Sequence, residues 1–520
     1  MKIVIIGGGS SGWITALAFY YVKKTNPDLD ITLIESPTIK KLSVGESTFP
    51  SLATLVHEAG IDEDDMLKKC NGTFKWGTKF SGFQDYDYYH PVFGMPYMDN
   101  DIPMDNVFIA HNKRIDLNCI GTHLMHNRKK PIKKYVSQSL LKANPIWLGK
   151  PSRVGPYAYH LDINKFVDYV KDFCTKNDSM DVIYNTVVDV ERDDTGIFTN
   201  AVCEDGLKVG GDFFIDCSGF SRLVFGQILK EKFISFKHLL PVDHAIPFNI
   251  KVDPPGYPGI QNEKFNKVRE SNVTATTLNS GWAWTIPLRD KTSRGYVYGS
   301  DFTTEDKVIK ELEETYGEIE INSKPIDLKT GVFERSSIKN MAAVGLSSGF
   351  IEPLESNATT ITTGQANYLA HLLTGSMQHT GGKYDINLIS DLYNKHSAKT
   401  YSHFLGFIKL HYTNVHRNDT KFWKHVRNDL QSFDRLNKFL DDIKYNNLSV
   451  RLPDGNDFYI DELEEDFGLS SWLLVLQAVG LIDSSCVDKK IKEIPFKPVE
   501  DFVNEEIRYY INLLKENSYE

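Results

Sequence analysis

The sequence predicts a mixed α/β fold whose first part is built on parallel strands and whose last part is mostly helical. Three observations support this prediction: a strand, glycine turn and helix in residues 2–24, two later strands that each run into a glycine turn, and helical periodicity beyond about residue 381. With 520 residues, 41% of them hydrophobic, the chain can bury a large core.

The N-terminal stretch has the pattern of a dinucleotide-binding unit. "KIVIIG" is a continuous apolar run typical of a buried parallel strand, and "GGGSSGW" places Gly7, Gly9 and Gly12 at G-x-G-x-x-G spacing. "WITALAFYYVKK" reads as a helix, and "DITLIES" as a second strand that ends in Glu35. The helix N-terminus can bind a pyrophosphate and Glu35 can accept ribose hydroxyls.

Two later segments favour FAD over NAD. "DFFIDCSGFSR", residues 212–222, and "MAAVGLSSGF", residues 341–350, resemble the later flavin-contacting segments of glutathione-reductase-type FAD proteins. The chain has no second G-x-G-x-x-G unit and hence no NAD(P)H domain of its own. We therefore expect the flavin to be reduced elsewhere or by transient NAD(P)H contact.

Charge and composition exclude several classes of partner. A net charge of -10, with neither sign gathered into long blocks, argues against binding to nucleic acid or an anionic membrane. Six scattered cysteines predict free thiols in a reducing compartment. No signal peptide precedes "MKIVIIGG", and the longest apolar run, "WLLVLQAVGLI", is too short to span a bilayer, so we expect a cytoplasmic protein.

A specific family resemblance extends from residue 7 to residue 423. The chain resembles flavin-dependent halogenases of the tryptophan-halogenase type in the order and spacing of these motifs: "GGGSSGW", "SVGESTFPSL", "FKWGTKF", "YAYHLD", "FIDCSGF", "GWAWTIPL", "SGFIEPLES" and "LHYTNVHRNDTKFW". The resemblance implies a glutathione-reductase-type, FAD-binding monooxygenase-like fold. It also implies cofactor contacts at Gly7, Gly9, Gly12, Trp13, Glu35, Gly45, Glu46, Ser47 and Gly345.

The resemblance implies a two-component reaction. FADH2 supplied by a flavin reductase reacts with O2 and a halide, and hypohalous acid then moves through the protein to a small electron-rich aromatic substrate. The sequence identifies no substrate, and it leaves open an assembly of several copies of the chain.

Lys79 and Glu355 are the catalytic residues that the resemblance implies. Lys79 would hold the hypohalous acid by a hydrogen bond or capture the halogen as a haloamine, and Glu355 would take the proton that leaves the arene. Strand alternation in "FKWGTKF" places Lys75 and Lys79 on one face and does not distinguish them. Glu352 competes with Glu355 on sequence alone, and both could also be surface acids of a turn.

Two further roles follow from the same resemblance. Trp282 and Trp284, two residues apart on a strand, would shield the flavin from organic substrate, although such a pair is more often part of a core. Asn357 and Ala358 occupy the halide positions, where the family has Thr followed by Gly or Ser. We expect this change to favour bromide or iodide over chloride, which needs a well-formed site most.

Two other groups of residues are interpreted as structural. Cys119, His123 and His126 have metal-like spacing, but no fourth ligand is evident and no metal site is expected. His160 precedes a predicted helix cap at Asp162 and is interpreted as a structural histidine.

We expect residues 1–380 to form the FAD-binding domain, with inserted antiparallel strands at about 235–300, and residues 381–520 to form a helical module over the substrate pocket. Two rival functions remain at this stage. One is a flavin-dependent aromatic hydroxylase, and the other is a non-catalytic FAD-binding redox protein.

Overall fold

The computed structural model describes residues 1–39, 45–96, 104–131, 133–135, 151–153, 156–176, 179–250, 271–321, 323–380, 385–446 and 467–516. The chain separates into two compact units, each assembled from three stretches. Unit 1 comprises Met1–Gly72, Leu161–Lys237 and Leu328–Leu405; unit 2 comprises Thr73–His160, His238–Asp327 and Gly406–Glu520. These units interleave along the sequence, and the functional division at residue 380 stays a prediction.

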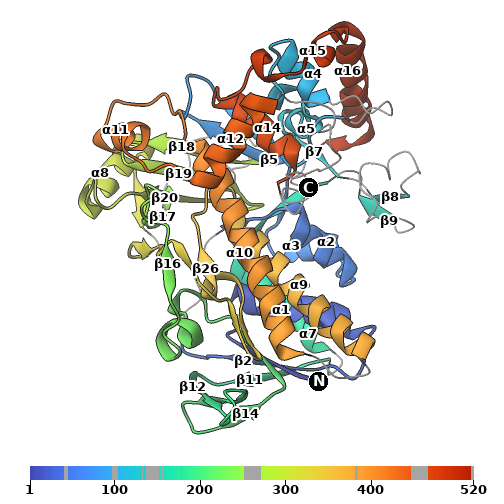
Figure 1. Cartoon of the computed structure of the whole chain (residues 1–520), viewed down its shortest axis with the longest axis vertical. Coiled ribbons are helices and arrows are strands. Elements are labelled where there is room, and N and C mark those ends of the chain that lie inside the picture. The colour runs from blue at the N-terminus through green and yellow to red at the C-terminus, as the bar shows by residue number, and fades with distance from the viewer. Residues whose placement is uncertain are drawn as a thin grey trace. The chain divides into compact units, whose positions relative to one another are not determined.

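Unit 1 contains a six-stranded sheet, of which Figure 1 labels β2 and β11. Its strands, in spatial order, are β11 (Asp181–Tyr184), β2 (Asp30–Glu35), β1 (Lys2–Ile6), β15 (Phe213–Asp216), β25 (Met341–Ala343) and β24 (Ser337–Ile338). All neighbouring pairs are parallel except β24 with β25. The predicted N-terminal strands and both late strands are therefore confirmed. Their apolar runs are buried because a parallel sheet is covered on both faces.

Helices and small sheets complete unit 1. The predicted first helix is α1 (Ser10–Lys23), which packs against α7 (Ile163–Thr175) and α9 (Asn357–Thr380) (Figure 1). The predicted cap is confirmed, because the Asp162 side chain accepts a hydrogen bond from the Lys165 N–H at the start of α7. The remaining elements are α2 (Pro50–Glu58), α3 (Glu63–Lys69), β3 (Gly45–Ser47), the sheet β12 (Val187–Arg192), β13 (Phe198–Cys203) and β14 (Lys208–Gly210), and the sheet β16 (Phe233–Ser235), β23 (Gly331–Phe333) and β26 (Gly349–Phe350).

Unit 2 is built on an eight-stranded sheet. Along its main path lie β21 (Ile319–Ile321), β17 (His244–Ile250), β20 (Thr292–Tyr298), β19 (Gly281–Pro287), β18 (Asn272–Leu278), β5 (Gly77–Ser81) and β6 (Tyr88–Pro91), and β22 (Ile326–Asp327) also pairs with β17. The pairs are antiparallel except β5 with β18. The strands expected at about 235–300 are present, while residues 251–270 of that span lie outside the described residues.

The predicted single strand through "FKWGTKF" is wrong. Thr73–Lys75 form β4, which pairs with β10 (Ala158–Asp162), whereas β5 begins at Gly77 and pairs with β18 and β6. Trp76 separates the two strands, with its backbone N–H bonded to Ser271 O at 2.7 Å and its indole N–H bonded to Lys129 O at 2.6 Å. A Cβ at Gly77 would lie 2.5 Å from His90 O, so glycine permits the close strand contact there. Lys75 and Lys79 therefore belong to different sheets.

The C-terminal part of the chain is mostly helical. The helical periodicity predicted there is confirmed by α10 (Ile386–His411), α12 (Asp434–Asn446) and α16 (Phe496–Leu513). The other helices are α4 (Met104–Ala110), α5 (Ile120–His126), α8 (Glu305–Tyr316), α11 (Lys421–Asn428), α14 (Leu469–Ala478) and α15 (Lys489–Lys492). Within the described ranges, no helix combines the length and the apolar character needed to cross a membrane. All six cysteines are free, as predicted.

Candidate active site

A cavity of about 530 Å³ lies in unit 1, at the carboxyl ends of the parallel strands. The turn between β1 and α1 forms one wall, and Glu35 at the end of β2 forms another. The segment after β15 contributes Ser218, Gly219 and Phe220. Crevices at this edge of an open parallel sheet are where such folds bind nucleotides, because the helix N-termini meet there.

The glycines of the first turn serve different purposes. Gly7 has a φ of +114°, and a Cβ there would lie 2.5 Å from Cys217 O. A Cβ at Gly12 would lie 1.9 Å from Gly7 O. Gly9 differs, since a Cβ there would meet no atom within 4 Å, although the residue lines the cavity. Gly7 and Gly12 thus allow the turn to form, while Gly9 leaves space for a pyrophosphate to approach the protein backbone.

The N-terminus of α1 points its unsatisfied donors at this cavity. Gly9 is the N-cap of the helix and supplies no side-chain cap, while Ser10 and Ser11 of the first turn also line the cavity. The first N–H groups of a helix have no intrahelical partner and attract anions. The geometry therefore fits the pyrophosphate of a dinucleotide.

Glu35 lies on the cavity wall, where the ribose of a dinucleotide was predicted to bind. It is buried, and its Oε2 forms an ion pair with Lys171 Nζ of α7 at 3.0 Å. Burial lowers the pKa of Lys171, but its hydrogen bonds to Tyr184 and Glu35 outweigh burial and raise that pKa overall. The pair holds the Glu35 side chain at the cavity wall, where its carboxyl oxygens can accept hydrogen bonds from hydroxyl groups.

The other predicted cofactor residues divide between the cavity and its surroundings. Glu46 in β3 lines the cavity, half-buried, and burial raises its pKa to about 7. Its neighbours Gly45 and Ser47 are buried and do not line the cavity. Trp13 is buried within α1, with Lys171 Nζ 5.9 Å from its ring. Gly345, with a φ of +69°, lies where a Cβ would meet Ser11 Oγ at 2.3 Å.

Several cavity residues were not predicted from the sequence. Asn164, Asn185 and Gln227 line the cavity from α7, the end of β11 and the short helical turn Leu223–Ile228 that follows β15. Their residue types are common on protein surfaces, so only the strand ends beside them could have indicated this position. Asp216 shapes the last of these turns, because its carboxylate accepts hydrogen bonds from the Ser218 and Val224 N–H groups at 2.9 and 3.1 Å.

The motif "EPLES" forms a buried turn between β26 and α9. Glu352 and Glu355 are both 0% exposed, so the alternative of surface acids is wrong for either residue. The Ser356 N–H bonds to Pro353 O at 2.9 Å, and Ser356 itself has a φ of +56°. Burial alone does not separate the two carboxylates.

Asn357 and Ala358 begin α9 directly after this turn. The Asn357 side-chain N–H donates to Glu352 O at 2.6 Å, and Asn357 is fully buried. Its Oδ1 has no hydrogen-bond partner among the described residues. These predicted halide residues thus occupy a helix N-terminus, where backbone N–H groups can face an anion.

Lys79 lies in unit 2, in the middle of β5. Its side chain is 23% exposed, and Nζ lies 2.8 Å from the Asp87 carboxylate. Lys75 is 0% exposed and ends β4. Lys79 and Glu355 belong to different units.

Trp282 and Trp284 lie two residues apart on β19 of unit 2. Their ring centroids are 6.5 Å apart in an edge-on arrangement. Trp282 is buried and Trp284 is half-buried, with its ring over Gly295. The cofactor cavity is formed by unit 1 residues, so the shielding role stays a prediction.

Of the residues interpreted as structural, His160 and Cys119 make buried polar contacts. His160 is buried, its Nδ1 lies 3.1 Å from Thr73 Oγ1, and burial together with nearby Lys75 holds its pKa well below the usual range. Cys119 is buried, and its thiol donates to Ile115 O at 3.4 Å. His123 and His126 lie in α5, and the part of the chain that the structure describes contains no group of three or more metal-ligating side chains.

Comparison with known proteins identifies the family. Residues 2–490 match the family described as tryptophan halogenase. Tryptophan 6-halogenase SttH of Streptomyces toxytricini is 29% identical over 447 residues, which cover 82% of this chain and 80% of its own. The structure of a tryptophan halogenase from Shewanella frigidimarina covers 100% of this chain and 96% of its own at 24% identity, and its TM-score of 0.83 shows the same fold.

One further solved structure is of a relative whose halide is stated. The tryptophan C-6 flavin-dependent halogenase of taromycin biosynthesis, described as a chlorinase, covers 99% of this chain and 98% of its own, with a TM-score of 0.79 and 25% identity. The family match spans both units and includes the glycine-lined cavity. The chain therefore belongs to the tryptophan halogenase family and is a flavin-dependent halogenase.

Proposed function

We propose that this halogenase uses FADH2 from a separate reductase to halogenate a small electron-rich aromatic compound, with Lys79 and Glu355 as its catalytic residues. The observation that carries the proposal is Glu355, a fully buried carboxylate directly before the N-terminus of α9. Burying a carboxylate is costly, and buried ionisable side chains are often found at functional sites. The burial of Glu355 therefore supports a functional role.

The residues of the unit 1 cavity fit FAD. Gly9 and Gly219 leave open space where a side chain would fill the cavity, and the first turn of α1 offers N–H donors for the pyrophosphate. Glu35 lines the same cavity, where its oxygens can accept ribose hydroxyls. When bound, reduced FAD would supply two of the four electrons that reduce O2, and halide would supply the other two, so that hypohalous acid and water are formed.

The two catalytic residues act on the oxidised halogen and on the arene. Lys79 donates an N–H hydrogen bond to the hypohalous acid and orients its halogen. The arene carbon attacks that halogen, the halogen–oxygen bond breaks, and the leaving hydroxide takes a proton from the Lys79 ammonium and departs as water, after which Lys79 regains a proton from solvent. Glu355 stabilises the positive charge that develops in the ring and then accepts the ring proton. Trp282 and Trp284 keep organic substrate away from the flavin in this proposal.

The halide preference rests on Asn357 and Ala358. Where the family has Thr, this chain has the amide side chain of Asn357, and where the family has Gly or Ser, it has the methyl group of Ala358. One Asn357 N–H is engaged with Glu352 O, and its carbonyl oxygen is buried at the same helix N-terminus, where it would repel an anion. Chloride is the most strongly hydrated of the three halides and needs the best site, so bromide or iodide is preferred. Because the relative from taromycin biosynthesis is a chlorinase, an assay of halide preference must include chloride as a competing halide.

A one-pot assay tests the function. The protein is mixed with FAD, NADH, an unrelated flavin reductase and equal concentrations of chloride, bromide and iodide. Tryptophan is the first substrate to test because the relatives are tryptophan halogenases, and phenols, pyrroles and other indoles follow. Halogen isotope patterns in the products support the proposal, as does inactivity when the reductase is left out. Hydroxylated product formed at full rate in halide-free buffer would refute it.

A further inference from the structure

Lys79 and Asp87 form an ion pair across two neighbouring strands. Lys79 pairs with Tyr89 and Phe80 pairs with Tyr88 in the antiparallel ladder of β5 and β6, so Asp87 lies diagonally across from Lys79. Their charged atoms are 2.8 Å apart. Burial raises the pKa of the Asp87 carboxyl, but hydrogen bonds from Lys79 and Ser81 outweigh burial and lower that pKa overall. Asp87 is therefore an ionised partner of the lysine.

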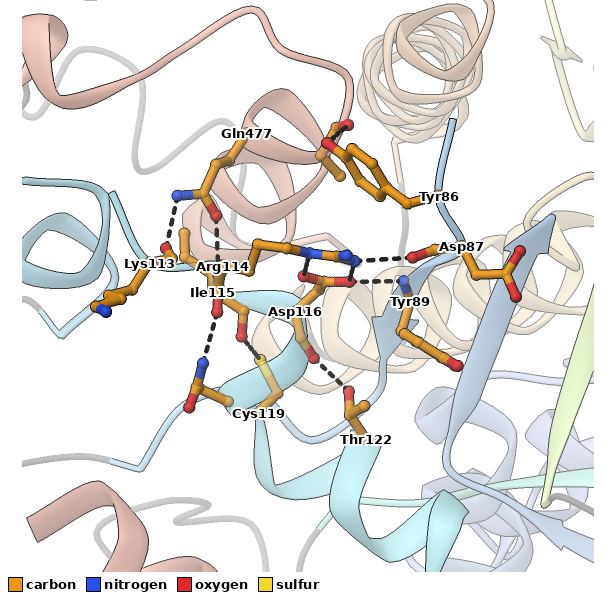
Figure 2. A network of polar contacts seen from close by, with 12 residues as sticks. Tyr86, Asp87, Tyr89, Lys113, Arg114, Ile115, Asp116, Cys119, Thr122 and Gln477 are labelled. Atoms are coloured by element: carbon orange, nitrogen blue, oxygen red, sulfur yellow. Dashed lines mark hydrogen bonds and ion pairs between the residues drawn. The ribbon is translucent and has the colours of Figure 1, made fainter. Parts of the chain in front are cut away.

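A second set of contacts fixes the backbone that carries Asp87. Arg114 Nη2 donates to Asp87 O at 2.8 Å, and the same guanidinium binds the buried Asp116 carboxylate through two hydrogen bonds. Asp116 also accepts the Tyr89 N–H at 3.1 Å. Figure 2 shows that Arg114 meets the backbone oxygen of Asp87 while the Asp87 carboxylate points away from Arg114.

Tyr86, the residue before Asp87, also contacts Arg114. The Tyr86 ring lies 4.4 Å from the Arg114 guanidinium, and its hydroxyl donates to Ala478 O at 2.8 Å. Contacts of the Tyr86 hydroxyl, the Asp87 carbonyl oxygen and the Tyr89 N–H thus hold this segment in place (Figure 2). Such a cluster restricts where the Asp87 carboxylate can lie, and a restricted carboxylate orients the ammonium that it binds.

We propose that Asp87 is a positioning residue for Lys79, holding it as an oriented ammonium that binds hypohalous acid by hydrogen bonding and does not become a haloamine. This inference rests on the proposed role of Lys79. Formation of a haloamine needs the nitrogen lone pair: R–NH2 and HOX give R–NHX and H2O. A carboxylate at hydrogen-bond distance favours the protonated form, which has no lone pair. An ammonium has three N–H groups, and hypohalous acid can accept one of them while Asp87 accepts another.

The test uses full-length protein with FAD, reductase, bromide and a substrate that the wild type halogenates. Asp87→Asn keeps the shape of the side chain and removes its charge. We expect product per FADH2 oxidised to fall roughly tenfold, the scale expected when a reacting group loses its orientation. FADH2 oxidation by O2 should stay at the wild-type rate, and oxidised bromide released to a thioether trap should rise. Asp87→Glu should restore most of the product yield.

A matched control lies two residues away. Asp85 also carries a carboxylate in an ion pair, with His416 at 2.7 Å, but it does not contact Lys79 in the described network. Asp85→Asn should leave the product yield unchanged. Wild-type yield in Asp87→Asn, or an equal loss in both variants, would overturn the role of Asp87. Detection of a stable haloamine at Lys79 by mass spectrometry would overturn it as well. Halogenation retained in Lys79→Ala would instead refute the proposed function.

Discussion

The Lys171 ammonium meets the Glu35 carboxylate at 3.0 Å on the wall of the cofactor cavity. Because the Glu35 oxygens at this wall can accept ribose hydroxyls, Glu35→Ala should weaken FAD binding by about tenfold, the equivalent of one charge-assisted hydrogen bond. Lys171→Met should weaken it less, since the carboxylate remains. Titration of flavin fluorescence gives both dissociation constants. Lys165→Met, an exposed change in the same helix, should have no effect.

Two glycines of the same turn should respond differently to alanine. Gly9→Ala adds a methyl group to open space, so the thermal midpoint without FAD should stay near wild type while FAD affinity falls at least tenfold. Gly12→Ala places its Cβ against Gly7 O, so the protein itself should lose stability. Calorimetry and flavin titration separate the two outcomes. Equal FAD affinity in Gly9→Ala and wild type would show that no phosphate lies against this turn.

Glu46 predicts a pH dependence of both stability and FAD binding. Its pKa is about 7 in the folded protein and ordinarily about 4.5, so the folded state holds a proton that the unfolded state has lost between these values. The contribution of Glu46 to the free energy of unfolding therefore falls as pH rises through this window and levels off above about pH 7. FAD should also bind more weakly at pH 8 than at pH 6, because an ionised Glu46 repels its pyrophosphate. Glu46→Gln should flatten both profiles, measured by denaturant titration and flavin titration.

The catalytic assignment makes three substitutions distinguishable. Lys79→Ala should abolish halogenation while FADH2 is still oxidised by O2. Glu355→Gln should slow turnover by roughly two orders of magnitude, as expected for loss of a positioned base. Glu352→Gln is the matched change in the same buried turn and should have a smaller effect. A larger loss in Glu352→Gln than in Glu355→Gln would move the base to Glu352.

Arg114 and Arg417 offer a comparison of equal geometry and unequal burial. Each arginine binds an aspartate two residues later through two hydrogen bonds, but Asp116 is buried and Asp419 is exposed. Arg114→Met should lower the free energy of unfolding by about 3 kcal/mol, because it leaves a buried carboxylate without its cation. Arg417→Met should cost less, about 1 kcal/mol or below for its ion pair. Urea unfolding curves of both variants test the difference.

Most of the cofactor-binding architecture could be predicted because it depends on short local patterns. The strand before Gly7 and the helix after it each have a distinct periodicity, and Glu35 follows at the end of the next strand. Long helices such as α10 and α16 are also visible in the apolar spacing of their own residues.

The rest depends on contacts between distant segments. Nothing within "FKWGTKF" indicates that Trp76 ends one strand, because its partners are Ser271 and Lys129. The Asp87 partner of Lys79 was missed for the same reason, since strand pairing and not spacing brings them together. Burial of Glu352 and Glu355 likewise follows from the packing of β26 and α9, which a run of acidic and small residues does not indicate.

The interleaving of the two units has a consequence for how the chain is made. β1 leaves the ribosome first, but β25, two strands away in the same sheet, follows more than three hundred residues later. The helix α10 then adds its Tyr393 and Tyr401 hydroxyls to Ala343 O and Ser348. The sheet of unit 1 therefore stays incomplete, with apolar strand edges uncovered, until the chain has been synthesised as far as Tyr401. Partly folded chains that wait for such long-range strand pairing are prone to aggregate, and a fragment that stops at residue 380 would lack α10 and its hydrogen bonds to Ala343 and Ser348.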